Sequence, residues 1–190
     1  MASEVEIANT ALSRVGATRI TALTENSVAA RAVNAIYNQM RDVELRAHVW
    51  NFAIKRAQLA EDATAPAFGP SASFTLPSDF IRLLPPDPEL HSNDLDWRIE
   101  GRHILTYDTA PLDIRYVYRV TDPNEMDPIF RQALALRIAR AICEPLTQSN
   151  TKLAAIDAEY KDTVREARKA DALEEPPVDQ PEDTWVTVRL

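Results

Sequence analysis

The residues that could carry chemistry are few and widely separated in this chain of 190 residues. Its three histidines, His48, His91 and His103, form no His-Glu-x-x-His pair, and Cys143 is the single cysteine. Zinc sites need several such ligands at short spacing, so the sequence favours a structural role for His48. The lone thiol stands in an apolar helical stretch, where we expect it to be buried and unreactive. We therefore expect no metal and no cofactor.

Phosphate loops and paired carboxylates give no stronger indication of catalysis. The three glycines, Gly16, Gly69 and Gly101, are too few for the usual nucleotide-binding spacing. The acid pairs Glu174-Glu175 and Glu182-Asp183 stand in a Pro-rich stretch, where neither burial nor fixed geometry can tune a proton donor. The sequence leaves Ser-His-Asp and Cys-His triads open, although it contains no nucleophile elbow. These observations predict a protein without a reaction centre.

Charge and hydropathy restrict the partners. The formal net charge is −8, whereas a protein that grips nucleic acid needs clustered Lys and Arg, so tight DNA binding is not expected. An acidic wall would still let DNA slide past. No apolar run approaches the roughly 20 residues that span a bilayer, and the first residues lack the pattern of a signal peptide. We expect a protein made in the cytoplasm, with no membrane anchor.

The first half of the chain reads as two helices. Residues 3–15 form an amphipathic stretch that Gly16 can stop. A second helix begins near Asn26-Ser27, and we expect it to reach about Ala60 unless it breaks near His48. This expectation rests on apolar positions that step by four and three, which are Ala29, Val33, Ile36, Met40, Val43, Ala47, Trp50 and Ile54.

A proline-rich stretch follows Glu61 and excludes helix. It holds five β-prone runs and a Glu100-Gly101-Arg102 link typical of a hairpin. We therefore expect an inserted antiparallel β-subdomain over residues 62–123. The predicted strands are Phe74–Leu76, Phe80–Leu84, Trp97–Glu100, His103–Tyr107 and Leu112–Val120.

Helix resumes after this insert. Asp127 is a good N-cap and Pro128 suits the first helical position, which predicts a third helix up to Pro145. A fourth follows Ser149 or Asn150. The predicted fold is mainly α with a small β part: a four-helix bundle formed by residues 1–61 and 124–173, an inserted antiparallel β-subdomain, and an extended C-terminal arm.

The arm comprises residues 174–190. Its Pro-rich acidic part cannot bury enough apolar surface to order itself, which indicates a flexible tether. The tether ends in a β-prone strip, interpreted either as a docking arm for a partner or as a strand that folds back onto its own β-subdomain. We take the docking residues to be Trp185, Val186, Thr187, Val188, Arg189 and Leu190.

Several short motifs then occur in a fixed order. Residues 41–53 carry Arg-Asp followed by Leu-Arg-x-His-x-Trp-Asn-Phe-Ala, residues 76–82 carry Leu-Pro-x-Asp-Phe-x-Arg, and a Gly-Arg hairpin and an Arg-Tyr strand come next. Over roughly residues 4–165 this series resembles the head-to-tail adaptor family of short-tailed bacteriophages, also called tail tubular protein A. The resemblance implies structural roles for Arg41, His48, Trp50, Asn51, Pro77, Asp79, Arg82 and Arg115.

The resemblance also implies a function. Such a protein is a non-enzymatic part of the virion neck, assembled in the host bacterial cytoplasm. A homo-oligomeric ring of about twelve copies joins the portal protein ring to the tail nozzle protein and extends the DNA channel. Double-stranded DNA passes through the lumen during genome ejection without tight binding, and the arm contacts the portal or a neighbouring subunit. Two alternatives stay open: an adaptor with added peptidoglycan-hydrolase activity, and an unrelated helical interaction module.

Overall fold

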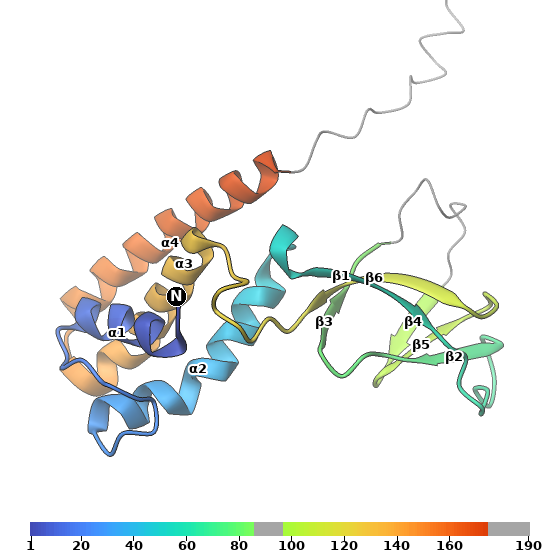
Figure 1. Cartoon of the computed structure of the whole chain (residues 1–190), viewed down its shortest axis with the longest axis horizontal. Coiled ribbons are helices and arrows are strands. Elements are labelled where there is room, and N and C mark those ends of the chain that lie inside the picture. The colour runs from blue at the N-terminus through green and yellow to red at the C-terminus, as the bar shows by residue number, and fades with distance from the viewer. Residues whose placement is uncertain (86–96, 175–190) are drawn as a thin grey trace, which may run out of the picture.

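The computed structural model describes residues 1–85 and 97–174, with helices gathered at one end and strands at the other (Figure 1). Within these residues the fold is a helical bundle with a small β part, as the sequence predicts. The helices are α1 (Glu4–Val15), α2 (Val28–Ala47), the short 3-10 turn η1 (Asn51–Ala53), α3 (Pro128–Thr147) and α4 (Asn150–Leu173). The strands are β1 (Ile54–Leu59), β2 (Ala72–Thr75), β3 (Phe80–Leu83), β4 (Trp97–Glu100), β5 (His103–Thr106) and β6 (Leu112–Tyr118).

Local capping residues explain where three of the helices begin and end. The Ser3 hydroxyl accepts the backbone N–H of Glu6 in the first turn of α1, and Gly16 ends that helix with a φ of 76°, which favours glycine. Asp127 caps α3 with Pro128 at the first helical position, and Ser149 caps α4. The predicted starts of these helices are confirmed. Helix α3 ends slightly later than expected, at Thr147.

Helix α2 is shorter than the apolar pattern predicts. It ends at Ala47, because His48 has an extended backbone with a φ of −144°. The predicted helix to Ala60 is therefore wrong, and the alternative, a break near His48, is confirmed. Residues 54–59 instead form β1, whose backbone pairs with β6 from Ile54↔Val117 to Leu59↔Leu112. Long-range pairing outweighs the local helical preference of this segment.

The buried face of α2 also differs from the predicted apolar seam. Val33 is buried as expected, but Val43 is 40% exposed. The face that packs inward includes two charged residues, because Arg41 and Glu44 have ion-pair partners that make their burial tolerable. A prediction from apolar positions alone therefore selects a face of α2 next to the one that is buried. The buried residues of α2 are Ala30, Val33, Tyr37, Arg41, Glu44 and Leu45.

The β-subdomain consists of two antiparallel sheets, with strand orders β1-β6-β3 and β2-β5-β4. All five predicted strands are present, and only β1 lies outside the predicted set. The expected hairpin joins β4 to β5, where Gly101 takes a φ of 59°. The sequence thus predicts the pairing of β4 and β5 but not the division into two sheets.

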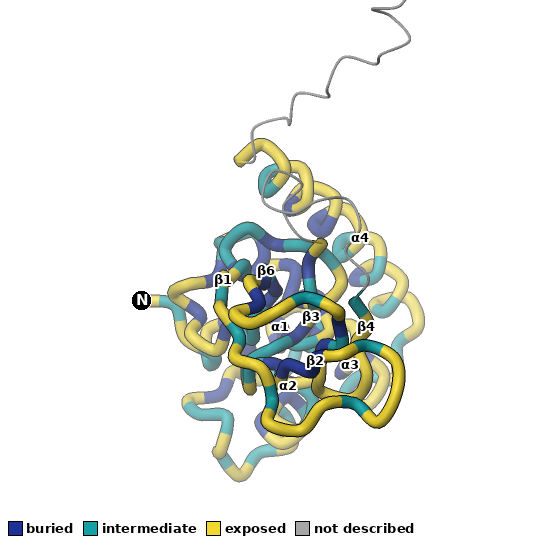
Figure 2. Tube along the Cα trace, turned by 90° about the vertical axis from the view of Figure 1, so that its right-hand side faces the viewer, coloured by how far each residue is buried: buried dark blue, intermediate teal, exposed yellow. Residues whose placement is uncertain are grey.

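Strand β6 lies between two hydrophobic cores. Leu112, Ile114 and Tyr116 face a small core between the sheets, whereas Val117 points to the large core of the helical bundle. From the β end of the molecule, Figure 2 shows buried strand segments framed by exposed loops. The sheet β1-β6-β3 therefore belongs to both layers, and the predicted boundary between residues 61 and 62 separates β1 from the sheet to which it belongs.

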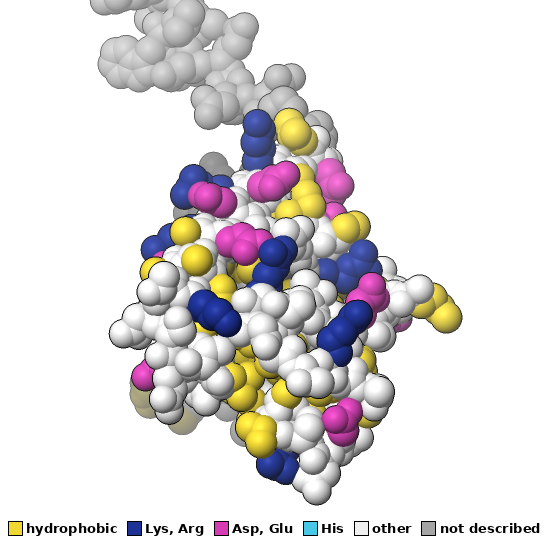
Figure 3. Space-filling view, turned by 90° about the vertical axis from the view of Figure 1, so that its left-hand side faces the viewer, with side chains coloured by type: hydrophobic (Ala, Val, Ile, Leu, Met, Phe, Trp, Pro, Cys, Tyr) yellow, Lys and Arg dark blue, Asp and Glu magenta, His cyan; other side chains and the backbone are white. Residues whose placement is uncertain are grey.

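The acidity of the chain is not spread evenly. Residues 86–96 hold four Asp and Glu and no Lys or Arg, and residues 175–190 hold four Asp and Glu and one Arg, which gives −4 and −3 of the total −8. The other residues sum to −1. On the face at the bundle end, Lys and Arg are interspersed with Asp and Glu (Figure 3). Residues 1–85 and 97–174 together are therefore nearly neutral, and most of the negative charge of the sequence lies in the other residues.

Candidate functional site

The corner between α2 and β1 is built around Trp50. Its side chain is 1% exposed, and Trp50 Nε1 donates a hydrogen bond of 3.0 Å to the backbone oxygen of Glu44. The indole ring contacts His48 and Phe130 edge to face, with centroid distances of 4.7 and 5.1 Å. The corner is thus filled by aromatic packing, which holds the chain where the helix gives way to the sheet.

Asp171 near the end of α4 fastens this corner to the bundle. The Asn51 backbone N–H donates to Asp171 Oδ1 at 2.9 Å, and the Asn51 side-chain amide donates to the Asp171 backbone oxygen at 2.8 Å. His48 Nε2 lies 3.1 Å from Asp171 Oδ2. The structural role expected for His48, Trp50 and Asn51 follows from these contacts. Asp171 was not among the predicted site residues.

Asp79, just before β3, joins the strands of the sheet β1-β6-β3 to one another. Asp79 accepts hydrogen bonds from the Tyr116 hydroxyl at 3.0 Å and from Lys55 Nζ at 3.1 Å, and its backbone oxygen accepts the Arg119 N–H. Burial raises the pKa of Asp79, but the hydrogen bonds from Lys55 and Tyr116 outweigh burial and leave the pKa below its ordinary value. This carboxylate stays ionised at neutral pH.

Asp42 connects α2 to the end of β6. Its Oδ1 accepts two hydrogen bonds from the buried Arg41 guanidinium, at 3.0 and 2.9 Å, and its Oδ2 accepts one of 2.8 Å from Arg119. Arg46, also on α2, donates to the backbone oxygen of Ile81. Side chains of α2 therefore fix two strands of the sheet against the bundle.

The remaining motif positions lie farther from this corner. Pro77 offers its backbone oxygen to Arg102 at 2.6 Å, which joins the turn before β3 to the β4–β5 hairpin. Arg115 is half-buried in β6, opposite Arg56 of β1. Arg82 is exposed on β3. The structure brings Arg41, His48, Trp50 and Asn51 to the junction of bundle and sheet, whereas Pro77, Asp79, Arg82 and Arg115 lie within the β-subdomain.

A buried ionic cluster lies inside the bundle, near the corner around Trp50. Glu44 is 0% exposed, and its Oε2 accepts hydrogen bonds from Arg137 and, at 2.9 Å, from the Tyr160 hydroxyl. Burial, followed by the nearby Glu44 charge, raises the pKa of Tyr160 to about 12. The cluster links α2, α3 and α4. The sequence does not predict the contacts of this cluster, although an acid on the inner face of a helix is a usable signal for a buried partner.

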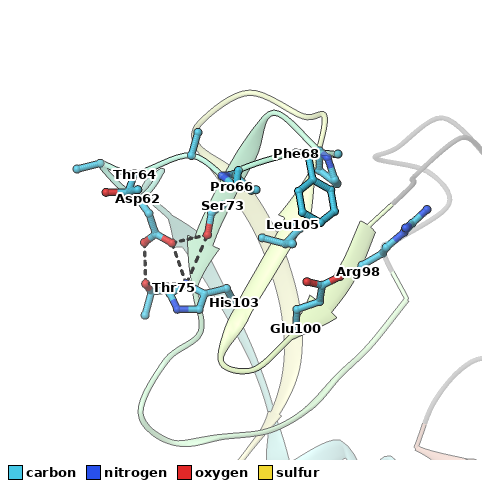
Figure 4. Close-up of a pocket in the computed structure, with 15 residues that line it drawn as sticks. Asp62, Thr64, Pro66, Phe68, Ser73, Thr75, Arg98, Glu100, His103 and Leu105 are labelled. Carbon is cyan, nitrogen blue, oxygen red and sulfur yellow. Dashed lines mark hydrogen bonds and ion pairs between the residues drawn. The ribbon is translucent and has the colours of Figure 1, made fainter.

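A hollow of about 670 Å³ lies on the outer face of the sheet β2-β5-β4, beside the loop between β1 and β2. Figure 4 shows Phe68 of this loop near Leu105, with Asp62 at the other side of the hollow. Phe68 is 90% exposed. Strand register places the polar residues of the hollow on one face of the sheet, namely Ser73, Thr75, Arg98, Glu100 and His103.

Asp62 organises the polar side of the hollow. It accepts hydrogen bonds from Ser73 Oγ at 2.7 Å and Thr75 Oγ1 at 2.6 Å, and His103 Nδ1 lies 2.9 Å from its Oδ2. The hydrogen bonds from Ser73 and Thr75, with a smaller part from His103, lower the pKa of Asp62 to about 2. A carboxyl group held so firmly in its ionised form is a poor general acid.

These residues do not form a nucleophilic triad. In a Ser-His-Asp triad the serine and the carboxylate bind opposite nitrogens of the imidazole ring. Here Ser73 Oγ and Asp62 Oδ2 both approach His103 Nδ1, at 3.4 and 2.9 Å, and the Ser73 proton goes to Asp62. Ser73 therefore lacks a base that would activate it, and the cluster acts as a clamp at the base of the loop.

The other predicted positions lie elsewhere. Cys143 is buried in α3, as expected. Within the described residues 1–85 and 97–174, no three His, Cys, Asp or Glu side chains gather where they could hold a metal ion. None of the helices in these ranges is long and apolar enough to cross a bilayer. His91 and the predicted docking residues Trp185–Leu190 fall outside the described ranges.

Comparison of the chain with known families and with curated proteins finds no match. The site is therefore interpreted from its own geometry: a rigid junction between bundle and sheet, and an open amphipathic hollow at the far end of the β-subdomain.

Proposed function

We propose that this protein is a structural head-to-tail adaptor of a short-tailed bacteriophage virion, without catalytic activity. In this role, copies of the chain form a ring between the portal protein and the tail nozzle protein. The observation that carries the proposal is the position of the motif residues. Arg41, His48, Trp50 and Asn51 all lie where α2 passes into the sheet, and His48 and Asn51 there bind Asp171 of α4, about 120 residues away in sequence.

A connector in a neck must hold two surfaces at a fixed separation. The junction supports such a role because hydrogen bonds from α2 and α4 join the sheet to the bundle at several independent points. The bundle and the β-subdomain then behave as one elongated wedge with two ends (Figure 1). Heterologous contacts between such wedges close into a ring when the rotation per copy permits.

The distribution of charge supports a passive relation to DNA. The residues that the structure describes have a net charge near zero, so they provide little long-range attraction for phosphates. Double-stranded DNA would then move through the ring without tight binding. The docking residues Trp185–Leu190 would hold the portal or a neighbouring subunit, and the protein would reside in the virion neck.

Electron microscopy of the protein mixed with isolated portal rings tests the proposal. We expect a second ring of about twelve copies stacked coaxially on the portal. The absence of stacked rings at any mixing ratio would contradict the adaptor role. The alternative of an added peptidoglycan hydrolase is tested by a gel that contains peptidoglycan, in which we expect no clearing at the position of this protein.

A further inference from the structure

Strand β4 forms one edge of the sheet β2-β5-β4 within the described residues. Its side chains face two different surroundings. Trp97 packs against the core between the sheets, whereas Ile99, which pairs with the buried Ile104, is 41% exposed. An exposed isoleucine on the core side of an edge strand leaves apolar surface that one more strand would cover.

The other face of β4 borders the hollow. Arg98 and Glu100 line it, together with Leu105 and the exposed Phe68 ring (Figure 4). A strand placed beside β4 would therefore meet the apolar core with one face and a mixed aromatic and charged surface with the other. The fitting sequence alternates apolar residues with amphipathic ones.

Residues 184–190 have this alternation. In an extended chain Val186, Val188 and Leu190 fall on one side, and Trp185, Thr187 and Arg189 on the other. The first set matches the core side of β4. The second set matches the hollow, where an indole suits Phe68 and Leu105, and a guanidinium suits the carboxylate of Glu100.

The chain is long enough for this contact within one molecule. Asn51 is hydrogen-bonded to Asp171, so the end of α4 lies beside the start of β1. Ten residues lead from Asn51 to Glu61, which bridges to Phe74 of β2. Strand β4 lies at the opposite edge of that sheet, two strand spacings or about 10 Å beyond β2. Residues 174–183 also number ten and extend to about 33 Å. The tether therefore reaches the hollow.

We propose that residues 184–190 of the same chain add, as a fourth strand, to the edge of β4 that no described strand covers, with Trp185 in the hollow beside Phe68. The docking arm is then stored on its own β-subdomain in the free protein and leaves that position to bind elsewhere. This storage does not depend on the adaptor role, so its failure would leave the proposed function standing.

Hydrogen exchange of the intact free protein, followed by mass spectrometry, tests the storage. A synthetic peptide of residues 184–190 supplies the unprotected reference rate. We expect these amides to exchange at least about tenfold more slowly in the intact chain than in the peptide. Exchange at the peptide rate in the intact chain would overturn the proposal.

Substitutions in β4 and in the arm test whether β4 is the binding site of the arm. Ile99→Arg places a charge on the core side of β4 and should return the arm to the peptide rate. The matched control is Val43→Arg, because Val43 on α2 is 40% exposed and lies outside the hollow; it should leave the protection unchanged. Val188→Arg alters the arm alone and should also abolish protection, so the test holds even if Ile99→Arg impairs folding.

Dilution shows whether the arm binds to its own chain or to a neighbouring copy. Storage within one chain predicts protection that is independent of protein concentration, in a monomer by light scattering. Protection that disappears on dilution, together with a dimer, would assign the arm to a neighbouring copy and contradict storage on its own sheet.

Discussion

Asn51 and Asp171 lie 120 residues apart in sequence and share two hydrogen bonds, at 2.9 and 2.8 Å. The pair fixes the last turn of α4 against the point where α2 gives way to the β-subdomain. An acid in the last turn of a helix opposes the helix dipole. The contacts with Asn51 and His48 explain why an aspartate is nevertheless found there.

Loss of the Asp171 side chain should loosen this junction. Asp171→Ala removes the acceptor for the part-buried Asn51 backbone N–H, and we expect the free energy of unfolding to fall by about 1–3 kcal/mol in urea titrations. The matched control on the same helix is Asp162→Ala, whose side chain is 71% exposed and pairs only with the neighbouring Arg165. It should change stability by less than about 0.5 kcal/mol. Equal effects would contradict a special role for Asp171.

Much of the fold follows from local signals in the sequence. Ser3, Gly16, Asp127 and Ser149 mark helix ends by satisfying or terminating backbone hydrogen bonding, and such signals need no knowledge of the rest of the chain. Strand β1 could not be predicted in this way. Its Lys, Arg, Ala, Gln and Leu residues are good helix formers, and only pairing with β6 makes the segment a strand.

The buried cluster of Glu44, Arg137 and Tyr160 provides a second test. Glu44→Ala would leave the Arg137 guanidinium without its partner at a position only 23% exposed, and we expect a loss of about 3 kcal/mol in unfolding free energy. Glu159→Ala serves as the control, because its pair with Arg14 is solvent-exposed and should contribute less than about 1 kcal/mol. The interpretation fails if the two variants are equally stable.

The site was predictable only in part, for a related reason. His48, Trp50 and Asn51 are predictable because they belong to the Leu-Arg-x-His-x-Trp-Asn-Phe-Ala motif, whose resemblance to the adaptor family implies structural roles. Their partners Asp171 and Glu44 are common acids whose importance arises from contacts across the fold. Such contacts cannot be predicted from the periodicity of the sequence.

Acid titration tests the clamp around Asp62. Its pKa is lowered to about 2 from 3.8, so the stabilisation by its hydrogen bonds is fully present above about pH 3.8 and disappears as the pH falls towards 2. NMR titration of the carboxyl carbon should give a pKa near 2. Ser73→Ala should move it up towards 3.8, because the hydrogen bond from Ser73 is the largest cause of the lowered pKa. Ser71→Ala, which changes an exposed residue outside this network, should leave it unchanged.

Removal of the arm tests its part in assembly. A chain that ends at Leu173 retains every helix and strand of the described fold, so we expect unchanged helical circular dichroism. Attachment to portal-bearing capsids should be lost, as judged by co-sedimentation. Trp185→Ala in the full chain should weaken attachment in the same direction, since an aromatic anchor dominates many docking contacts. Undiminished attachment of the truncated chain would refute the docking role of residues 185–190.

The most direct test of the central claim is cryo-electron microscopy of DNA-filled heads that lack this protein, imaged before and after the purified protein is added. The account predicts a new collar below the portal with rotational symmetry, into which the wedge of bundle and β-subdomain fits as one rigid body. A portal vertex that stays bare after addition would contradict it.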